Sequence, residues 1–277
     1  MKFLVLILAA SLFLAMAPAS GADLSKLESL AGAEHHAFAS DKVGRTFHLY
    51  VRTPDGYASA DRPYPVVYVL DGGTLFPIFA SLQMLLEVDE AAPKAIIVGI
   101  AYGGLDFESG NYRSTDYTEQ TADPDFPYWG GADAFRAALR DEIAPFIEET
   151  YRADPSRRIL YGQSIGGQFV LHAARREPDL FWGLIAANPA LHRNLDRFLS
   201  PAGVDAASPP NVFIARGEFD DRTYSDPMDQ WVEHWSKVDS TGWRLKIDTL
   251  DGEGHSSIAP AAYKAGMAWL FSEREGR

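Results

Sequence analysis

Ser164 has the surroundings that point most directly to chemistry. It is the centre of Gly162-Gln163-Ser164-Ile165-Gly166, which matches the pattern G-x-S-x-G. The apolar run at 159–161 predicts a buried strand before the serine, and the apolar residues from Phe169 onward predict a buried helix after it. A strand, a tight glycine-flanked turn and a helix form the context of a nucleophile elbow, so we expect Ser164 to be a nucleophile. The alternative is a turn whose serine only caps the following helix.

His255 is the expected general base for that serine. A hydroxyl attacks a carbonyl well only when a base accepts its proton, and the base needs an acid to orient it. In sheets of this kind the acid and then the histidine follow the serine along the chain, in loops after strands. His255 stands in the glycine-rich segment 251–257, directly after a predicted strand at 244–250. A structural hydrogen bond of a loop histidine is the alternative.

Asp220 is the preferred orienting acid. It follows the predicted strand at 212–215, and Gly217 supplies a short turn that could aim it at His255. Glu218 and Asp221 are alternatives, and any of the three could instead be an ordinary solvated loop carboxylate.

The tetrahedral oxyanion of an acyl-transfer reaction needs two aimed N–H donors. The amide of Ile165 is one candidate, since it lies at the start of the helix behind Ser164, where dipole and free N–H groups favour negative charge. Gly73 is the second candidate, in Asp71-Gly72-Gly73 at the end of a predicted strand at 64–70. A plain β-turn is the alternative interpretation of these glycines.

The irregular segment 105–131 is the candidate source of substrate contacts. A segment of this length without regular structure is usually functional or disordered, and its many aromatic residues argue against disorder. Tyr128 and Trp129 are the aromatic residues that we expect to contact substrate.

Two further side chains are candidate substrate contacts. Arg113 could meet an oxygen-rich ligand, or it could only pair with Asp116 or Asp123. His192 follows Asn188-Pro189-Ala190 at the end of a predicted strand, from which it could line the cleft.

Strands and helices alternate along the chain, which predicts an α/β fold with a mostly parallel central sheet and helices on both faces. The continuous apolar runs at 64–70 and 95–100 are typical of strands buried on both faces. We expect residues 20–40 to be a loosely packed lead-in. The remaining predicted strands are 43–53 and 181–187, and the predicted helices are 132–151, bent at Pro145, then 226–238 and 259–271.

Composition narrows the class of protein further. The formal net charge of −13 disfavours nucleic acid and anionic membranes as partners. The chain contains no cysteine, which excludes disulfides, thiolate catalysis and cysteine-based zinc sites. Because the usual metalloprotease, P-loop and dinucleotide patterns are also absent, we expect no cofactor and no metal. The candidate nucleophile, acid and base point instead to a small-molecule ester as the partner.

The first residues predict an export signal. Lys2 precedes an apolar stretch at 3–17, and Ala17-Pro18-Ala19 offers a cleavage site. We therefore expect a signal peptide at 1–19, a single catalytic domain at 20–277, a periplasmic or secreted location and no stable membrane insertion after cleavage. An uncleaved anchor is the alternative.

Six blocks taken together resemble the esterase D-type putative esterases of the α/β-hydrolase fold, and within them most closely the exported siderophore esterases of the enterobactin type. The resemblance implies cofactor-independent hydrolysis of a carboxylic ester such as a catecholate trilactone, with Ser164 and His255 at matching positions. Feruloyl or acetyl-type carbohydrate esterases and acyltransferases share the fold, and a non-catalytic binding protein is a remaining alternative. The blocks are YVLDGG at 68–73, YRSTDYT at 112–118, GADAF at 131–135, YGQSIGGQF at 161–169, ARGEFDD at 215–221 and GEGHSS at 252–257.

Overall fold

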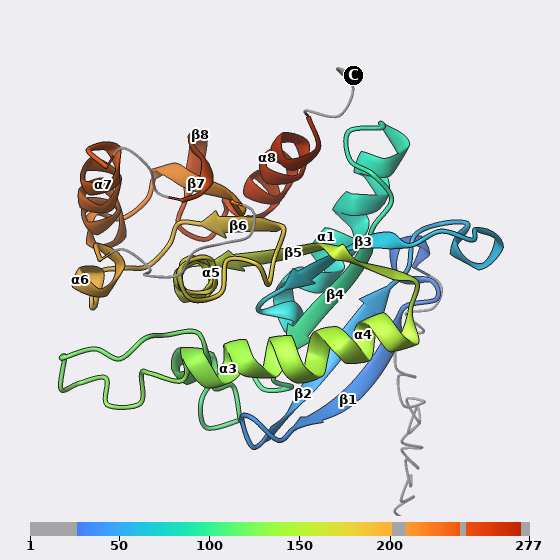
Figure 1. The fold of residues 1–277 in the computed structure, drawn as a ribbon, viewed down its shortest axis with the longest axis horizontal. Coiled ribbons are helices and arrows are strands. Elements are labelled where there is room, and N and C mark those ends of the chain that lie inside the picture. Colours follow the sequence, from blue (N-terminus) through green and yellow to red (C-terminus); the bar gives the residue numbers. More distant parts are fainter. Residues whose placement is uncertain (1–26, 201–208, 239–241, 273–277) are drawn as a thin grey trace, which may run out of the picture.

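A computed structural model describes residues 27–200, 209–238 and 242–272. The predicted signal peptide at 1–19 lies outside these residues. The described chain forms one eight-stranded sheet, in the order β1-β2-β4-β3-β5-β6-β7-β8, with helices packed on both faces (Figure 1).

Antiparallel pairing is confined to one side of the sheet, where β1 pairs with β2 and β2 with β4. Every other neighbouring pair is parallel. The predicted mostly parallel α/β architecture is therefore confirmed. The strands are β1 (Glu34–Ser40), β2 (Arg45–Arg52), β3 (Tyr64–Val69), β4 (Ile96–Ala101), β5 (Ala153–Gln163), β6 (Gly183–Ala187), β7 (Asn211–Phe219) and β8 (Arg244–Gly254).

The helices cover the sheet in two layers. Apolar side chains of α1 and α8 pack on one face, and those of α3, α4, α5 and α7 pack on the other. The helical segments are η2 (Glu28–Leu30), η3 (Tyr57–Ser59), α1 (Gly72–Val88), α2 (Arg113–Asp116), α3 (Ala132–Ala138), the π-helical turn η4 (Leu139–Ile143), α4 (Ala144–Thr150), α5 (Ile165–Arg176), α6 (Leu195–Phe198), α7 (Arg222–Ser236) and α8 (Ala259–Phe271).

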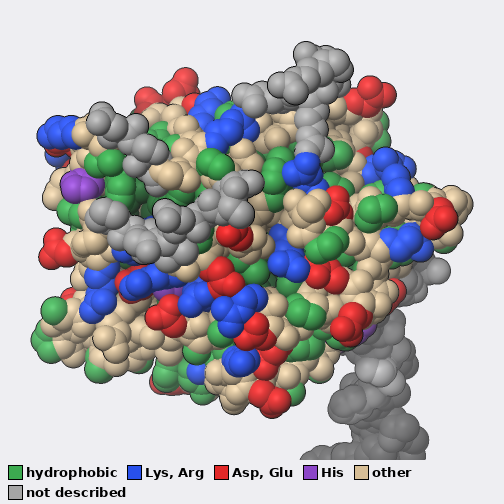
Figure 2. Space-filling model, viewed as in Figure 1, with side chains coloured by type: hydrophobic (Ala, Val, Ile, Leu, Met, Phe, Trp, Pro, Cys, Tyr) green, Lys and Arg blue, Asp and Glu red, His purple; other side chains and the backbone are tan. Residues whose placement is uncertain are grey.

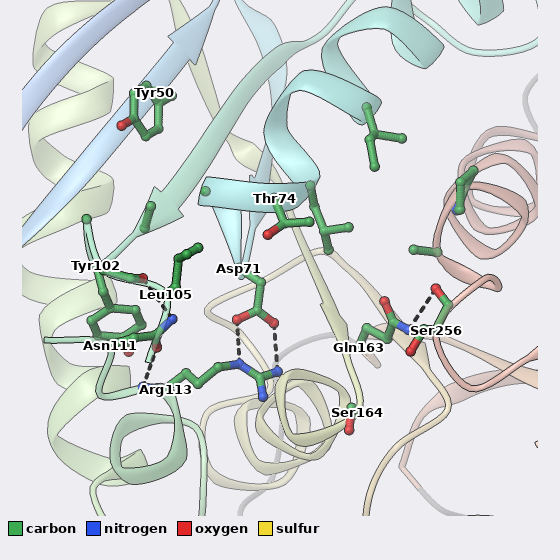
Figure 3. Close-up of a pocket in the computed structure, with 18 of the residues that line it drawn as sticks. Tyr50, Asp71, Thr74, Tyr102, Leu105, Asn111, Arg113, Gln163, Ser164 and Ser256 are labelled. Carbon is green, nitrogen blue, oxygen red and sulfur yellow. Dashed lines mark hydrogen bonds and ion pairs between the residues drawn. The ribbon is translucent and has the colours of Figure 1, made fainter. Parts of the chain in front are cut away.

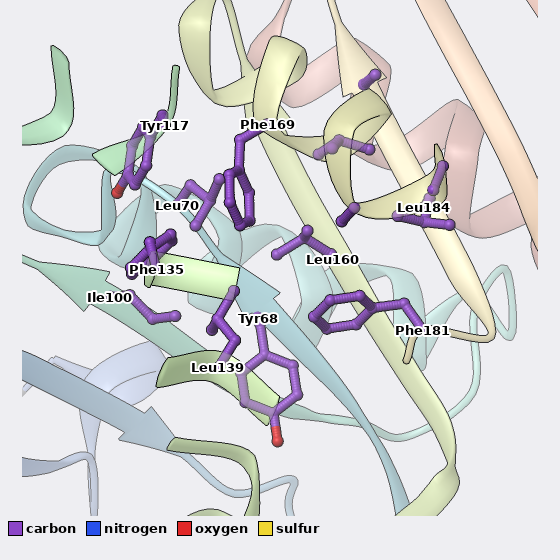
Figure 4. Close-up of a cluster of buried hydrophobic side chains, with 14 of the residues drawn as sticks. Tyr68, Leu70, Ile100, Tyr117, Phe135, Leu139, Leu160, Phe169, Phe181 and Leu184 are labelled. Carbon is purple, nitrogen blue, oxygen red and sulfur yellow. The ribbon is translucent and has the colours of Figure 1, made fainter. Parts of the chain in front are cut away.

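The alternation of side chains along β3 explains why this strand reads as a continuous apolar run. Val66 and Tyr68 belong to the core on the α5 face, whereas Val67 and Val69 belong to the core on the α1 face. Because successive side chains point to opposite faces, a central strand buried on both sides needs apolar residues at every position. Figure 4 shows the first of these cores, where Tyr68 lies among side chains of β5, α5 and η4.

Two expectations differ from the structure. Residues Glu34–Ser40 are not a loose lead-in but the edge strand β1, paired along its length with β2. An edge strand with exposed faces lacks the apolar run that marks a central one, which is why the pattern did not reveal it. The helix predicted at 132–151 carries a π-helical turn immediately before Pro145, which accommodates the proline without ending the helix.

Charge is mixed rather than gathered on the face shown in Figure 2, where acidic and basic side chains lie interspersed. Within the described ranges, no helix has both the length and the apolar character needed to cross a membrane.

Candidate active site

Ser164 stands in a strained turn between β5 and α5. Its backbone has φ 58° and ψ −121°, which is a rare conformation for a residue other than glycine. A Cβ at Gly162 would come within 2.2 Å of the carbonyl oxygen of Gly166, and one at Gly167 within 3.0 Å of that of Ala187. The close approach of backbone therefore leaves no room for a side chain at Gly162, as a nucleophile elbow demands, and crowds one at Gly167, whereas a Cβ at Gly166 would meet nothing closer than 3.5 Å.

A line of hydrogen bonds joins the three residues that the sequence predicts for catalysis. Ser164 Oγ lies 2.9 Å from His255 Nε2, and His255 Nδ1 lies 2.8 Å from Asp220 Oδ1. The carboxylate holds the proton on Nδ1, which leaves Nε2 free to accept the serine proton. The side chain of Asp220 is almost fully buried, so its carboxylate binds the imidazole and is not an ordinary solvated loop carboxylate.

The sheet register explains why Asp220 and His255 meet. Phe219 of β7 pairs with Gly254 of β8, so the two catalytic candidates are the next residues on neighbouring parallel strands. Both strands run further than the sequence predicted, to Phe219 and Gly254, which places the pair at the carboxyl edge of the sheet.

Two residues that the sequence reasoning missed hold the loops in place. The side-chain amide of Asn188 donates to the carbonyl of Gly254, at 3.2 Å, and its oxygen accepts from the amide of Gly217, at 2.8 Å. Gln163, the residue before the serine, donates to the carbonyl of His255 at 2.5 Å. In the sequence, only the position of Asn188 directly after a predicted strand could have drawn attention to it, since its positive φ of 40° is visible in the structure alone.

Aromatic packing fixes the orientation of the imidazole. The ring of Tyr224, on α7, stacks on His255 with centroids 4.1 Å apart and an interplanar angle of 23°. His192 in turn packs edge-on against Tyr224 at 5.0 Å. Burial, followed by the charges of Arg193 and His255, lowers the pKa of His192, so its ring is a neutral packing partner near pH 7.

A cavity of about 810 Å³ opens beside Ser164 (Figure 3). It lies between the start of α1, the segment that follows β4, and the loop that carries His255. Apolar side chains form part of its wall, among them Leu75, Ile78, Leu105 and Pro260. Its size is that of a pocket for a drug-sized molecule.

A salt bridge crosses one wall of this cavity. Arg113 donates from Nε and Nη2 to the two carboxylate oxygens of Asp71, at 2.6 and 2.9 Å, as the dashed lines in Figure 3 mark. Asp71 has φ 56° and directly precedes α1. The alternative in which Arg113 pairs with Asp116 or Asp123 is wrong, because those carboxylates bind Arg45 and Arg193.

The predicted oxyanion donors both lie in the first turn of a helix, Gly73 in α1 and Ile165 in α5. Gly73 lines the cavity together with Ser164. The glycine that steric contact requires is its neighbour Gly72, whose added Cβ would lie 2.5 Å from the backbone of Gly99; a Cβ at Gly73 meets nothing closer than 3.7 Å.

Three predicted substrate contacts are not brought to the cavity: in the described part of the chain, its wall includes neither Tyr128, Trp129 nor His192. Trp129 is 8% exposed and packs edge-on against Phe126, so it is part of the core. Tyr128 is 40% exposed and lies against Phe126 and an exposed phenylalanine, outside the cavity.

A serine, a histidine and a carboxylate joined in one line, at the carboxyl edge of a mostly parallel sheet, define a serine hydrolase of the α/β-hydrolase fold. Sequence comparison gives the family. The model of the family described as "Putative esterase" matches residues 40–251. The chain belongs to this putative esterase family, and it is a serine esterase.

Individual relatives agree with this assignment. The chain is 30% identical over 261 residues to the ferri-bacillibactin esterase BesA of Bacillus subtilis (strain 168), covering 84% of this chain and 87% of that protein. It is 33% identical over 175 residues to the apo-salmochelin esterase of Escherichia coli O6:H1, covering 59% of this chain and 54% of that protein. The crystal structure of an IroE-like serine hydrolase from Shewanella oneidensis is similar with a TM-score of 0.76 and 25% identity, covering 87% of this chain and 80% of that one.

Proposed function

We propose that this protein hydrolyses the lactone esters of a catecholate siderophore through a covalent acyl-enzyme on Ser164. The observation that carries the chemistry is the pair of hydrogen bonds from Ser164 to His255 and from His255 to Asp220. The substrate class is supported by the relatives, of which two are named for siderophore esters. The mixed apolar and polar wall of the cavity suits aromatic rings that carry hydroxyl groups.

In the first step Ser164 Oγ attacks the ester carbonyl carbon while His255 Nε2 accepts the hydroxyl proton. The resulting imidazolium is stabilised by Asp220. When the tetrahedral intermediate collapses, the C–O bond to the leaving alcohol breaks and the imidazolium donates its proton to that alkoxide. Water then attacks the acyl-enzyme, losing a proton to His255, and releases the acid and the free serine.

The oxyanion is placed, in this proposal, between the amides of Ile165 and Gly73. First-turn amides of a helix have no intrahelical acceptor, so they are free to donate to a ligand. Two such N–H groups from separate helices, that of Ile165 next to Ser164 in the chain and that of Gly73 in the wall of the same cavity, supply the pair of donors that acyl transfer needs.

Steady-state hydrolysis tests the proposal. Wild-type protein is expected to cleave both a p-nitrophenyl ester and enterobactin, whereas Ser164→Ala is expected to lose at least about 10⁴-fold in kcat on both. Ser256→Ala, which removes another serine of the same cavity wall, is the matched control and is expected to retain activity. Equal turnover by wild type and Ser164→Ala would refute the nucleophile; wild-type cleavage of the simple ester without cleavage of enterobactin would refute the substrate class.

We also propose that the protein is exported, on the strength of Lys2, the apolar stretch at 3–17 and the site Ala17-Pro18-Ala19. Expression in a Gram-negative host, followed by N-terminal sequencing of the periplasmic fraction, is expected to give a chain that begins at Ser20. Full-length protein recovered in the cytoplasm would contradict export.

A further inference from the structure

The charge around the cavity distinguishes the two forms in which a catecholate siderophore ester exists. Free catechols keep their protons near neutral pH, because phenols titrate near pH 10. The ferric complex is a trianion, since three doubly ionised catechols surround one Fe(III). An enzyme that binds the trianion needs cationic groups that are free to meet it.

The cavity offers no net positive charge to such an anion. Of the described residues that form its wall, the charged ones are Asp71 and Arg113, and they neutralise each other in a bidentate ion pair. Two of the donor groups of the guanidinium are directed at Asp71 and are thus withheld from a ligand. The trianion would also meet the Asp71 carboxylate itself, which lies in the same wall.

The segments that carry the catalytic acid and base add negative charge beside the cavity. Residues 216–222 and 251–257 contain five carboxylates against two arginines. One of these arginines, Arg216, is already paired with Asp229. The carboxylate of Glu218 accepts from the amide of Gly252, which holds it next to the His255 loop. The whole chain, at −13, repels an approaching anion as well.

Apolar side chains, and not cationic ones, form much of the cavity wall. Leu105, which is 94% exposed, and Ile78, which is 41% exposed, stand at the cavity wall together with the buried Leu75. Such side chains gain free energy by covering uncharged aromatic rings, and they would desolvate a trianion without compensation.

From this balance of charge we infer that the esterase selects the iron-free, uncharged catecholate ester and discriminates against the ferric trianion. The inference rests on the proposed function. It assigns the enzyme to cleavage of siderophore that carries no metal, in contrast to a reaction that opens the ferric complex. The relatives leave the choice open, because one is named for a ferric substrate and another for an iron-free one.

The test compares kcat/KM for enterobactin with and without bound Fe(III), near neutral pH and at two salt concentrations. The iron-free ester is expected to be preferred by at least about tenfold, mainly through KM, and the preference is expected to shrink as salt screens the repulsion. Equal rates, or a preference for the ferric form, would overturn the inference and leave the proposed function in place. Cleavage of neither form, with p-nitrophenyl ester hydrolysis retained, would overturn the proposed function and the inference with it.

A charge placed at the wall gives an independent check. Leu105→Lys adds one cation at the exposed rim. It is expected to lower the ratio of kcat/KM for the iron-free ester to that for the ferric ester about threefold at low salt. Leu105→Gln removes the same apolar side chain without adding charge, so it measures how much of the preference the apolar contact supplies, and its ratio of the two substrates is expected to fall between those of the wild type and Leu105→Lys. Identical ratios in the two variants would show that charge does not set the selection.

Discussion

The two sides of the active site are built in different ways. On one side, the catalytic candidates follow the carboxyl ends of β5, β7 and β8, and each is hydrogen-bonded to the next. On the other side, the cavity wall comes from the start of α1 and the segment after β4, and it is held by packing, one ion pair and hydrogen bonds such as that from Asn111 to Gly104. The chemistry is thus encoded in short motifs at strand ends, whereas the pocket arises from contacts between segments far apart in the sequence.

Removal of the base is expected to have the largest effect on the catalytic side. His255→Ala leaves Ser164 without a proton acceptor, so kcat for a p-nitrophenyl ester is expected to fall by about 10⁴-fold or more. His192→Ala removes the histidine that packs on the other side of Tyr224, and this variant is expected to keep most of the activity. If the two substitutions lower kcat equally, the base has been assigned to the wrong histidine.

Adjacent carboxylates sharpen the assignment of the acid. Asp220→Asn disturbs the tautomer and charge that prepare His255, and kcat is expected to fall about 10³-fold. Asp221→Asn changes the exposed N-cap of α7, where asparagine caps as well as aspartate, so kcat is expected to stay within about twofold. Assays of the two variants side by side separate orientation of the imidazole from a general loss of negative charge; a comparable loss in both would contradict the role of Asp220.

Two neighbouring aromatic residues test whether the cavity wall has been assigned correctly. Trp129→Ala removes a buried ring, and the free energy of unfolding is expected to fall by about 3 kcal/mol while kcat/KM changes little. Tyr128→Ala, at an exposed position, is expected to cost less than about 1 kcal/mol. Denaturant unfolding of both variants measures this difference. A large loss of kcat/KM in Trp129→Ala without a loss of stability would instead place that ring in the substrate site, as the sequence predicted.

Asp116, which accepts a hydrogen bond from Tyr102 of the cavity wall, gives the smallest and most pH-specific effect. Burial raises its pKa to about 6, although Arg45 and a hydrogen bond from Tyr102 oppose the shift. A carboxyl whose pKa is raised in the folded state binds more protons there than when unfolded, so its contribution to stability is lost as pH rises. Between about pH 4 and pH 6 the wild type is therefore expected to lose on the order of 2 kcal/mol relative to Asp116→Asn. Unfolding curves across this range measure it, and a difference that grows in favour of the wild type would have the wrong sign.

The sequence was sufficient for the fold and for the catalytic line because both follow local rules. Continuous apolar runs predict the central strands, and the triad candidates Ser164, Asp220 and His255 each follow a strand in the order that the fold requires. The sequence could not show that Phe219 pairs with Gly254. The order of the motifs along the chain was nevertheless enough to predict that the next residues, Asp220 and His255, would meet.

The supporting residues and the pocket could not be predicted in the same way. Asn188 and Gln163 act through hydrogen bonds to backbone atoms of distant loops, which no local pattern records. Asp71 was read only as part of a glycine-rich turn, and its partnership with Arg113 depends on how two segments pack over the sheet. Trp129 is of a residue type that often contacts ligands, and only its burial in the structure shows that it belongs to the core.

Covalent labelling tests the central claim most directly. The full chain is treated with a fluorophosphonate, digested, and analysed by peptide mass spectrometry, with His255→Ala and Ser256→Ala in parallel. The account predicts a single adduct on the peptide that contains Ser164, formed at the wild-type rate in Ser256→Ala and far more slowly in His255→Ala. An adduct on another residue, or labelling of Ser164 that does not depend on His255, would contradict it.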